Sequence, residues 1–307
     1  MNSKPIIHIG FPKTGTTWLQ KEFFPNVEDI NFIQRNDIIE YILKPNTFEF
    51  DPNLAKKYFE NGKRNVICDE ILVGGLDVCF GNGAFIKETG NRLKQIFNEA
   101  EIIIFIRNQP SIVASAYFQY IKAGGNFSAT KFLNKSNKHY SFLVNQMLFS
   151  YDIFKFDQCI SFYKKLYGNE NVQVFLYEDF NENKTDFLNK FKQKYNLKID
   201  VETLNIQTYQ NQRYKNFIIK LARFTNSFSL KRTIFKYYIF HIPYFYNLCH
   251  RVYIKLNKYC FFIKNSSDES IIGKKNMKIV NDYYKESNKN LIEKHGVENI
   301  TKYNYPL

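Results

Sequence analysis

The sequence predicts an α/β protein in which a parallel sheet is flanked by helices. Four short apolar runs have the length and composition of buried strands, at residues 6–9, 65–69, 102–106 and 172–176. The stretches between these runs show helical spacing of apolar side chains, most clearly at residues 93–97, 112–120 and 154–166. Strands that alternate with helices form parallel sheets with helices on both faces, so this is the fold class we expect.

The size and composition of the chain favour one large domain. With 307 residues, of which 44% are hydrophobic and 18% aromatic, the chain can bury a sizeable core, which excludes a disordered protein. Neither an internal repeat nor a low-complexity linker divides the sequence. We therefore expect a single domain over residues 1–307.

Residues 214–264 differ from the rest of the chain. They are basic and rich in Phe and Tyr, and they contain no convincing strand, so we expect a helical appendage within the domain. We favour an appendage that packs against the core and shapes a binding site. The alternative is a surface that contacts a membrane, although no apolar run is long enough to cross a bilayer.

The net charge is strongly positive. A formal charge of +14 favours anionic partners such as nucleotides, nucleic acid, anionic glycans or membrane surfaces. However, Lys, Asn, Ile, Phe and Tyr are abundant throughout the chain, as a biased genome composition would also produce. The charge alone therefore names no partner.

The cysteine pattern predicts neither a disulfide framework nor a metal site. The chain has five scattered cysteines, Cys68, Cys79, Cys159, Cys249 and Cys260. They form no C-x-x-C pair and have no histidine at metal-ligand spacing, which favours a reducing, cytoplasmic compartment. Because residues 1–5 lead directly into the first apolar run, we expect no signal peptide or anchor before the domain. The expected location is the cytoplasm, either in solution or at the inner face of the membrane.

The first predicted strand leads into a loop suited to anions. Residues 10–18 read Gly-Phe-Pro-Lys-Thr-Gly-Thr-Thr-Trp, and Thr16 or Thr17 can cap a helix that ends at Pro25. Backbone N–H groups of such a loop, together with the helix N-terminus, bind phosphate-like groups. A nucleotide triphosphatase loop would place its lysine directly after the second glycine, where this chain has Thr16. The loop lysine, Lys13, instead lies two residues before Gly15.

Residues 12–19 carry a resemblance to a known family. They read Pro-Lys-Thr-Gly-Thr-Thr-Trp-Leu and satisfy every position of P-K-[ST]-G-T-[ST]-W-L, the 5'-phosphosulfate loop of sulfotransferases. These enzymes use adenosine 3'-phosphate 5'-phosphosulfate (PAPS) and release adenosine 3',5'-bisphosphate (PAP). The resemblance implies a fold like that of P-loop nucleotide hydrolases. It also implies donor contacts from six residues, Lys13, Thr14, Gly15, Thr16, Thr17 and Trp18.

A second candidate anion site follows the strand at residues 102–106. Arg107 lies at the carboxyl end of that strand, where ligands of open α/β sheets collect. Pro110 suits the first turn of a helix, which we expect to end near Ala123 because Gly124 can supply a left-handed cap.

Arg107 and Ser115 resemble the 3'-phosphate motif of the same family, R-N-P-x-x-x-x-x-S. The chain departs from it at Gln109, where proline is usual, although Pro110 follows directly. Ser111 and Ser115 are four residues apart and share a helix face. A separate 3'-phosphate site is what distinguishes PAPS from ATP, so the two motifs together select PAPS. The family resemblance also makes Arg213, in the basic turn 210–215, a candidate to close over this phosphate.

The resemblance implies that Lys13 stabilises the departing phosphate oxygen, and nothing in the sequence requires a metal. Glu70 directly follows the strand at residues 65–69, so we predict it to be the general base that accepts the proton of the acceptor, with Asp69 as the fallback. His8 alternates with apolar neighbours on the first strand, which favours a core role. Two further candidates lack supporting spacing, His139 and Asp179.

The predicted function is transfer of a sulfuryl group from PAPS to a hydroxyl or amine. In the family that the chain resembles, many enzymes that act on sugars use a Glu base and many that act on small phenols use a His. Because Glu70 is better placed than any histidine, the resemblance implies a carbohydrate or polysaccharide precursor as the preferred acceptor. Two alternatives remain: a P-loop kinase, which shares the strand, loop and helix, and a non-enzymatic basic protein that binds nucleic acid or an anionic glycan. We expect no nucleic-acid partner, because Lys and Arg are spread along the chain and no known binding module is present.

Overall fold

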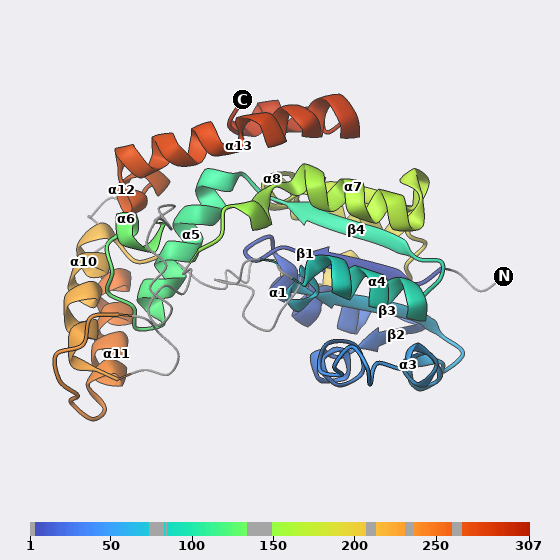
Figure 1. Cartoon of the computed structure of the whole chain (residues 1–307), viewed down its shortest axis with the longest axis horizontal. Coiled ribbons are helices and arrows are strands. Elements are labelled where there is room, and N and C mark those ends of the chain that lie inside the picture. Colours follow the sequence, from blue (N-terminus) through green and yellow to red (C-terminus); the bar gives the residue numbers. More distant parts are fainter. Residues whose placement is uncertain are drawn as a thin grey trace.

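The computed structural model describes residues 4–73, 83, 85–133, 149–206, 213–230, 236–259 and 266–307. Five parallel strands form one sheet in the order β2-β3-β1-β4-β5 (Figure 1). Their bounds are β1 Ile6–Gly10, β2 Ile30–Ile33, β3 Arg64–Asp69, β4 Glu101–Ile106 and β5 Val172–Leu176. The predicted α/β class is confirmed, and all four predicted strands are present. The edge strand β2 was not predicted, because it is only four residues long and three of them are half-buried.

Side chains that alternate along each strand form two separate cores, one on each face of the sheet. On β1, Ile7 and Ile9 belong to one apolar cluster, whereas Ile6 belongs to the other. Since successive side chains of a strand point to opposite faces, continuous apolar runs are what a sheet covered on both sides requires.

Helices cover both faces. The core on the first face contains side chains of α4 (Ile86–Ile96), α5 (Gln109–Lys122) and α7 (Phe156–Tyr167), and α13 (Lys274–His295) packs on α7 and α5. The second face packs against α1 (Thr16–Trp18) with its π-helical continuation Leu19–Phe23, α8 (Tyr177–Glu182) and α9 (Lys184–Lys194). The remaining helices are α2 (Arg35–Ile38), α3 (Pro52–Phe59), α6 (Ala129–Phe132), α10 (Asn216–Thr225), α11 (Phe245–Tyr259) and α12 (Asp268–Ile272). The helices expected at residues 93–97, 112–120 and 154–166 correspond to α4, α5 and α7.

The appendage expected at residues 214–264 contains α10 and α11, which lie beyond α5 and away from the sheet (Figure 1). On α10, Ile218, Ile219 and Ala222 are buried in the main core, whereas on α11 Tyr253 is the buried side chain. The appendage thus packs on the core through α10 and through Tyr253 of α11, whereas most side chains of residues 236–259 are exposed.

The long C-terminal helix α13 is attached to the start of α5 by a buried amide pair. Gln109 Nε2 donates to Asn288 Oδ1 at 2.6 Å, and Asn288 Nδ2 donates back to Gln109 Oε1 at 3.1 Å and to the Pro306 carbonyl at 2.8 Å. Both side chains are fully buried. This pairing explains the departure from the motif at Gln109, since a proline there could not bind Asn288. Proline still falls in the first helical turn, at Pro110.

Among the described residues, no helix combines the length and the hydropathy that crossing a lipid bilayer requires. Cys68, Cys159 and Cys249 are free thiols, whereas Cys79 and Cys260 lie outside the described residues.

Candidate functional site at the carboxyl edge of the sheet

The predicted site residues follow the carboxyl ends of neighbouring parallel strands. β1 lies in the middle of the sheet, with β3 on one side and β4 on the other. The chain leaves β1 toward β2 and β3 and then crosses to β4, so the loop after β1 lies where the strand order reverses. Open α/β sheets bind ligands at such a point.

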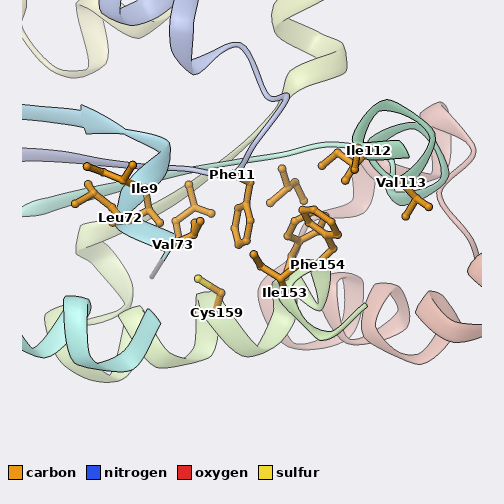
Figure 2. Close-up of a cluster of buried hydrophobic side chains, with 14 of the residues drawn as sticks. Ile9, Phe11, Leu72, Val73, Ile112, Val113, Ile153, Phe154 and Cys159 are labelled. Carbon is orange, nitrogen blue, oxygen red and sulfur yellow. The ribbon is translucent and has the colours of Figure 1, made fainter. Parts of the chain in front are cut away.

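The loop after β1 is anchored in the core by Phe11. This side chain is fully buried, and its ring lies 4.8 Å from that of Phe156 in an edge-to-face arrangement. Figure 2 shows Phe11 between Val73 on one side and Phe154 on the other. The buried side chain of Phe11 therefore holds the first part of the loop in place.

The loop backbone folds tightly on itself. Thr14 is fully buried, and its hydroxyl donates to the Phe11 carbonyl at 2.6 Å. A Cβ on Gly10 would lie 2.5 Å from the Thr16 hydroxyl oxygen, and Gly15 has a φ of 90°. A side chain at position 10 would clash with Thr16, and position 15 has a left-handed backbone that residues other than glycine rarely adopt. Both positions therefore require glycine. These contacts produce a compact cradle of the kind that an anion occupies.

Lys13 is in a left-handed conformation, with a φ of 68°. A lysine in this region costs about 1 kcal/mol, so the surrounding contacts must hold it there. The Arg107 guanidinium donates to the Lys13 carbonyl at 2.9 Å, and the Lys13 ammonium donates to the side-chain carbonyl of Gln119 on α5. The structure thus joins the loop directly to the second predicted motif.

Polar side chains form a line along α5 that faces the loop. Ser111 accepts a hydrogen bond from Arg107 at 2.7 Å, and Gln119 accepts from Lys13. Ser115 lies midway, four residues from each, and residues with this spacing lie on one face of a helix. The side chain of Ser115 is 9% exposed. Ser115 therefore lies on the face of α5 that also carries Ser111 and Gln119, between the residues that bind Arg107 and Lys13.

Arg213 converges on the same place. Its guanidinium donates to the Ser111 carbonyl at 3.2 Å and forms an ion pair with Asp268. Arg107 binds the side chain of that serine, so the two arginines meet at one residue. Residues 210–212 of the predicted basic turn lie outside the described residues.

Arg107 and Arg213 bring two guanidinium groups to Ser111 at the start of α5, a place here called the Arg107 corner. Burial lowers the pKa of the Arg107 guanidinium from its usual value, and the positive charge of Arg213 lowers it further, whereas Tyr177 and Glu178 raise it. The ring of Tyr177 lies under the Arg107 guanidinium, 4.7 Å from its carbon, and also beside Gly15. Asp268, the ion-pair partner of Arg213, also raises the pKa of Arg107. A bound anion would add a further favourable charge for both guanidinium groups.

The C-terminal segment closes the far side of the Arg107 corner. The Asn108 amide nitrogen donates to the carbonyls of Tyr303 and Asn304 at 3.1 and 2.9 Å. The Asn108 backbone N–H donates to Glu178, which also accepts from the Tyr305 hydroxyl. This wall, built from the last residues of the chain, was not predicted.

The other loop residues have different surroundings. Thr16 is buried and Thr17 half-buried. Trp18 is 6% exposed in the second core, where its ring packs on Phe180 and its indole N–H donates to the Asn205 carbonyl at 3.4 Å. Trp18 therefore helps to fix the helix that supports the loop, and the donor contact predicted for it stays a prediction.

Asp69 and Glu70 differ sharply in what they bind. Asp69 is 1% exposed, and its two oxygens accept four hydrogen bonds, two from Arg35 and one each from Gln20 and the Ile71 backbone. Glu70 is 25% exposed on its side chain and lies 3.6 Å from Arg35. Since Ile9 pairs with Asp69 across the sheet, Glu70 follows β3 level with Gly10. Asp69 therefore has a structural task, and Glu70 is the better placed carboxylate.

His8 lies in the core beneath the loop, as its alternation with apolar neighbours predicts. It is 1% exposed, its Nδ1 lies 2.9 Å from the Cys68 sulfur, and its ring packs edge-to-face on Phe105. Burial lowers the pKa of His8 to about 3, so its imidazole is neutral in the folded protein at physiological pH.

This buried histidine makes stability depend on pH. The unfolded chain takes up a proton on His8 below its ordinary pKa of 6.5, whereas the folded protein does not until about pH 3. We expect the free energy of unfolding to fall as pH drops from 6.5 toward 5, with His8 contributing about 1.4 kcal/mol per pH unit. Urea unfolding of His8→Asn at both pH values should show a shallower fall. The exposed His241→Asn should keep the wild-type slope, and equal slopes in the wild type and His8→Asn would contradict this account.

Two weaker candidates can also be placed. Asp179 accepts a hydrogen bond from the Tyr303 hydroxyl at 2.5 Å, so it holds the C-terminal segment. His139 lies outside the described residues. The described part of the chain contains no cluster of three or more His, Cys, Asp or Glu side chains that could hold a metal ion.

Sequence reasoning missed two neighbours of the loop, Gln119 and Tyr177. Gln119 could have been found from the spacing of Ser111, Ser115 and Gln119, which are polar side chains at four-residue intervals in an otherwise apolar helix. Tyr177 directly follows a strand, as Arg107 and Glu70 do. Its role depends on stacking with Arg107, which no local pattern reveals.

Comparisons with known proteins give structural similarity only. No protein-family model and no curated protein sequence matches the chain. A sulfotransferase from Alicyclobacillus acidocaldarius is 14% identical with a TM-score of 0.49, covering 69% of this chain and 87% of that one. Mouse sulfotransferase SULT7A1 complexed with PAP is 17% identical with a TM-score of 0.37, covering 65% of this chain and 61% of that one. The sulfotransferase domain from the curacin biosynthetic pathway is 13% identical with a TM-score of 0.38, covering 69% of this chain and 79% of that one. With TM-scores below 0.5, these likenesses leave the functional argument to the site's own residues.

Proposed function

We propose that this protein transfers a sulfuryl group from PAPS to a hydroxyl or amine of an acceptor, with carbohydrates as the preferred acceptor class. The observation that carries the proposal is the contact between the two motifs. Arg107 binds the Lys13 carbonyl, while the line from Ser111 to Gln119 joins both residues to α5. One ligand with an anionic group at each of two nearby positions would engage both motifs.

The residues suit such a donor. The compact turn from Gly10 to Thr17 offers backbone N–H groups and a lysine to the 5'-phosphosulfate, while Arg107, Ser115 and Arg213 offer charge and a hydroxyl to the 3'-phosphate. When bound, PAPS supplies an activated sulfuryl group and a bisphosphate leaving group. Lys13 neutralises charge that builds on the leaving oxygen, so positioning and electrostatics account for most of the rate.

Glu70 accepts the proton of the acceptor group in this proposal. Its carboxylate is partly exposed and follows β3, the strand next to the one that carries the loop. The guanidinium of Arg35 lies 3.6 Å from this carboxylate. In the family whose loop this chain resembles, a Glu base is common among enzymes that act on sugars and a His base among those that act on small phenols, which is why we prefer a carbohydrate acceptor.

The kinase alternative has less support. Its loop needs a lysine directly after the second glycine, where this chain has Thr16, and Arg107 with Arg213 would have no role toward ATP. Turnover of ATP with magnesium in the absence of PAPS would favour the kinase.

Binding of two adenosine nucleotides tests the donor assignment. PAP and ADP both carry a 5'-phosphate, but only PAP has a 3'-phosphate to engage Arg107, Ser115 and Arg213. We expect PAP to bind at least about thirtyfold more tightly by calorimetry, because charged hydrogen bonds contribute about 2 kcal/mol. Equal affinity would remove the argument from the second motif. Incubation with labelled PAPS and a panel of sugars, phenols and amines would then identify the acceptor.

A further inference from the structure

The appendage carries an unusual concentration of exposed apolar side chains. Every residue from Tyr237 to Tyr244 is exposed, and Tyr244 is 84% exposed with a φ of 62°. Fourteen of the twenty large apolar side chains that are exposed in the described residues lie between Phe217 and Tyr259. Isolated exposed apolar residues are normal, but a concentration of this kind marks an interaction surface.

The exposed rings are in contact with one another. Phe228 lies 5.2 Å from Phe224, 5.3 Å from Phe240 and 6.4 Å from Phe245, measured between ring centroids. Phe224 on α10 is 65% exposed, and Phe240 in the following segment is 52% exposed. The segment is held in place by hydrogen bonds from the Ile239 and Ile242 N–H groups to the carbonyls of residues 227 and 228. The aromatic cluster is therefore a built feature.

Helix α11 extends this surface and adds positive charge. Leu248, Val252 and Tyr259 are exposed and lie on one line of the helix, since they are separated by four and seven residues. Lys255 falls on the same line, and Arg251 lies beside it. The opposite side of α11 packs on α10 through Tyr253.

The whole region lacks negative charge. Between Glu202 and Asp268 the sequence contains eleven Lys and Arg residues and no Asp or Glu. The excess of positive charge is thus concentrated in this part of the sequence, and Lys220, Arg251, Lys255 and Lys258 are exposed on α10 and α11. A partner for this surface must be negatively charged and also accept apolar side chains.

We infer that the exposed side chains of residues 217–230 and 236–259 form a docking surface for an anionic phospholipid bilayer. Phe, Leu, Ile and Val side chains gain free energy by entering the acyl region, and Lys and Arg lie at the level of anionic headgroups. Nucleic acid would satisfy the charges but would leave aliphatic side chains such as Ile239, Ile242 and Val252 in water. A bilayer satisfies both features.

Vesicle sedimentation of the full chain tests the inference. We expect binding to vesicles of equal parts phosphatidylglycerol and phosphatidylcholine, weaker binding in high salt, and little binding to phosphatidylcholine alone. Leu248→Asp should lower the partition coefficient about tenfold, because one apolar anchor is lost and one negative charge is added. Leu54→Asp on α3 is the matched control, since Leu54 and Leu248 are 58% and 61% exposed. Both positions are exposed, so circular dichroism should show that both variants fold.

Three outcomes would overturn the inference. The first is that the wild-type chain does not bind anionic vesicles. The second is that Leu248→Asp and Leu54→Asp lose vesicle binding equally. The third is that the chain binds single-stranded RNA with micromolar affinity in a filter assay and does not bind vesicles. The last outcome would assign the surface to nucleic acid instead.

Discussion

Lys13→Ala is expected to abolish sulfate transfer while leaving the fold intact. The ammonium of Lys13 is the loop's positive charge toward the leaving oxygen, and loss of one such donor typically costs a hundred- to a thousandfold in kcat. The backbone of the loop should persist, because Phe11, Thr14 and Arg107 hold it through contacts that do not involve the lysine side chain. The measurement is initial-rate transfer from labelled PAPS, with thermal unfolding as the check on folding.

A matched control separates catalysis from loss of general charge. Lys21 follows in the same helical run and is exposed, so Lys21→Ala should transfer sulfate at the wild-type rate. Gln119→Ala removes the resting partner of Lys13 but leaves the charge, so it should retain most of the activity. Near-normal turnover in Lys13→Ala would reject the role assigned to this lysine.

Arg107→Ala should weaken PAP binding about a hundredfold, equivalent to about 2.7 kcal/mol, because a largely desolvated guanidinium and its charged hydrogen bonds are lost. The preference for PAP over ADP should collapse with it. Arg107 also binds the Lys13 carbonyl, so kcat should fall as well. Calorimetry with both nucleotides measures the preference, and single-turnover kinetics measures the chemical step.

Arg251→Ala is the control for Arg107→Ala. It removes the same charge from an exposed position on α11 and should leave both nucleotide affinities unchanged. Arg107→Lys keeps the charge but loses the planar fork, so it should recover only part of the affinity. An unchanged preference for PAP over ADP in Arg107→Ala would place the 3'-phosphate elsewhere.

The sheet could be predicted from the sequence because its strands are uninterrupted apolar runs. The strand at residues 172–176 agrees to the residue, and the others agree within one or two. Helix α13 was not predicted, since its surface is highly charged and its buried side chains include Asn276, Ser287 and Asn288. These polar side chains are buried only because partners distant in sequence bind them, so no local periodicity identifies the helix.

The site could be predicted in part. Lys13, Arg107 and Ser115 belong to motifs with fixed spacing, and the structure brings the loop and α5 into contact. The donor contact predicted for Trp18 stays a prediction, and its ring also packs on Phe180 in the second core. The task of Asp69 depends on Arg35, which follows β2, the strand that the sequence did not reveal.

The Asn108 contacts with the C-terminal segment have a consequence for how the protein acquires activity. The joined residues are 195 and 196 positions apart in the sequence. Closing so large a loop costs substantial conformational entropy. Such long-range contacts tend to form late, after the local helices are in place. During synthesis, the surroundings of Arg107 therefore stay unfinished until residues 303–304 have been made, so binding competence depends on a segment far beyond the first half of the chain.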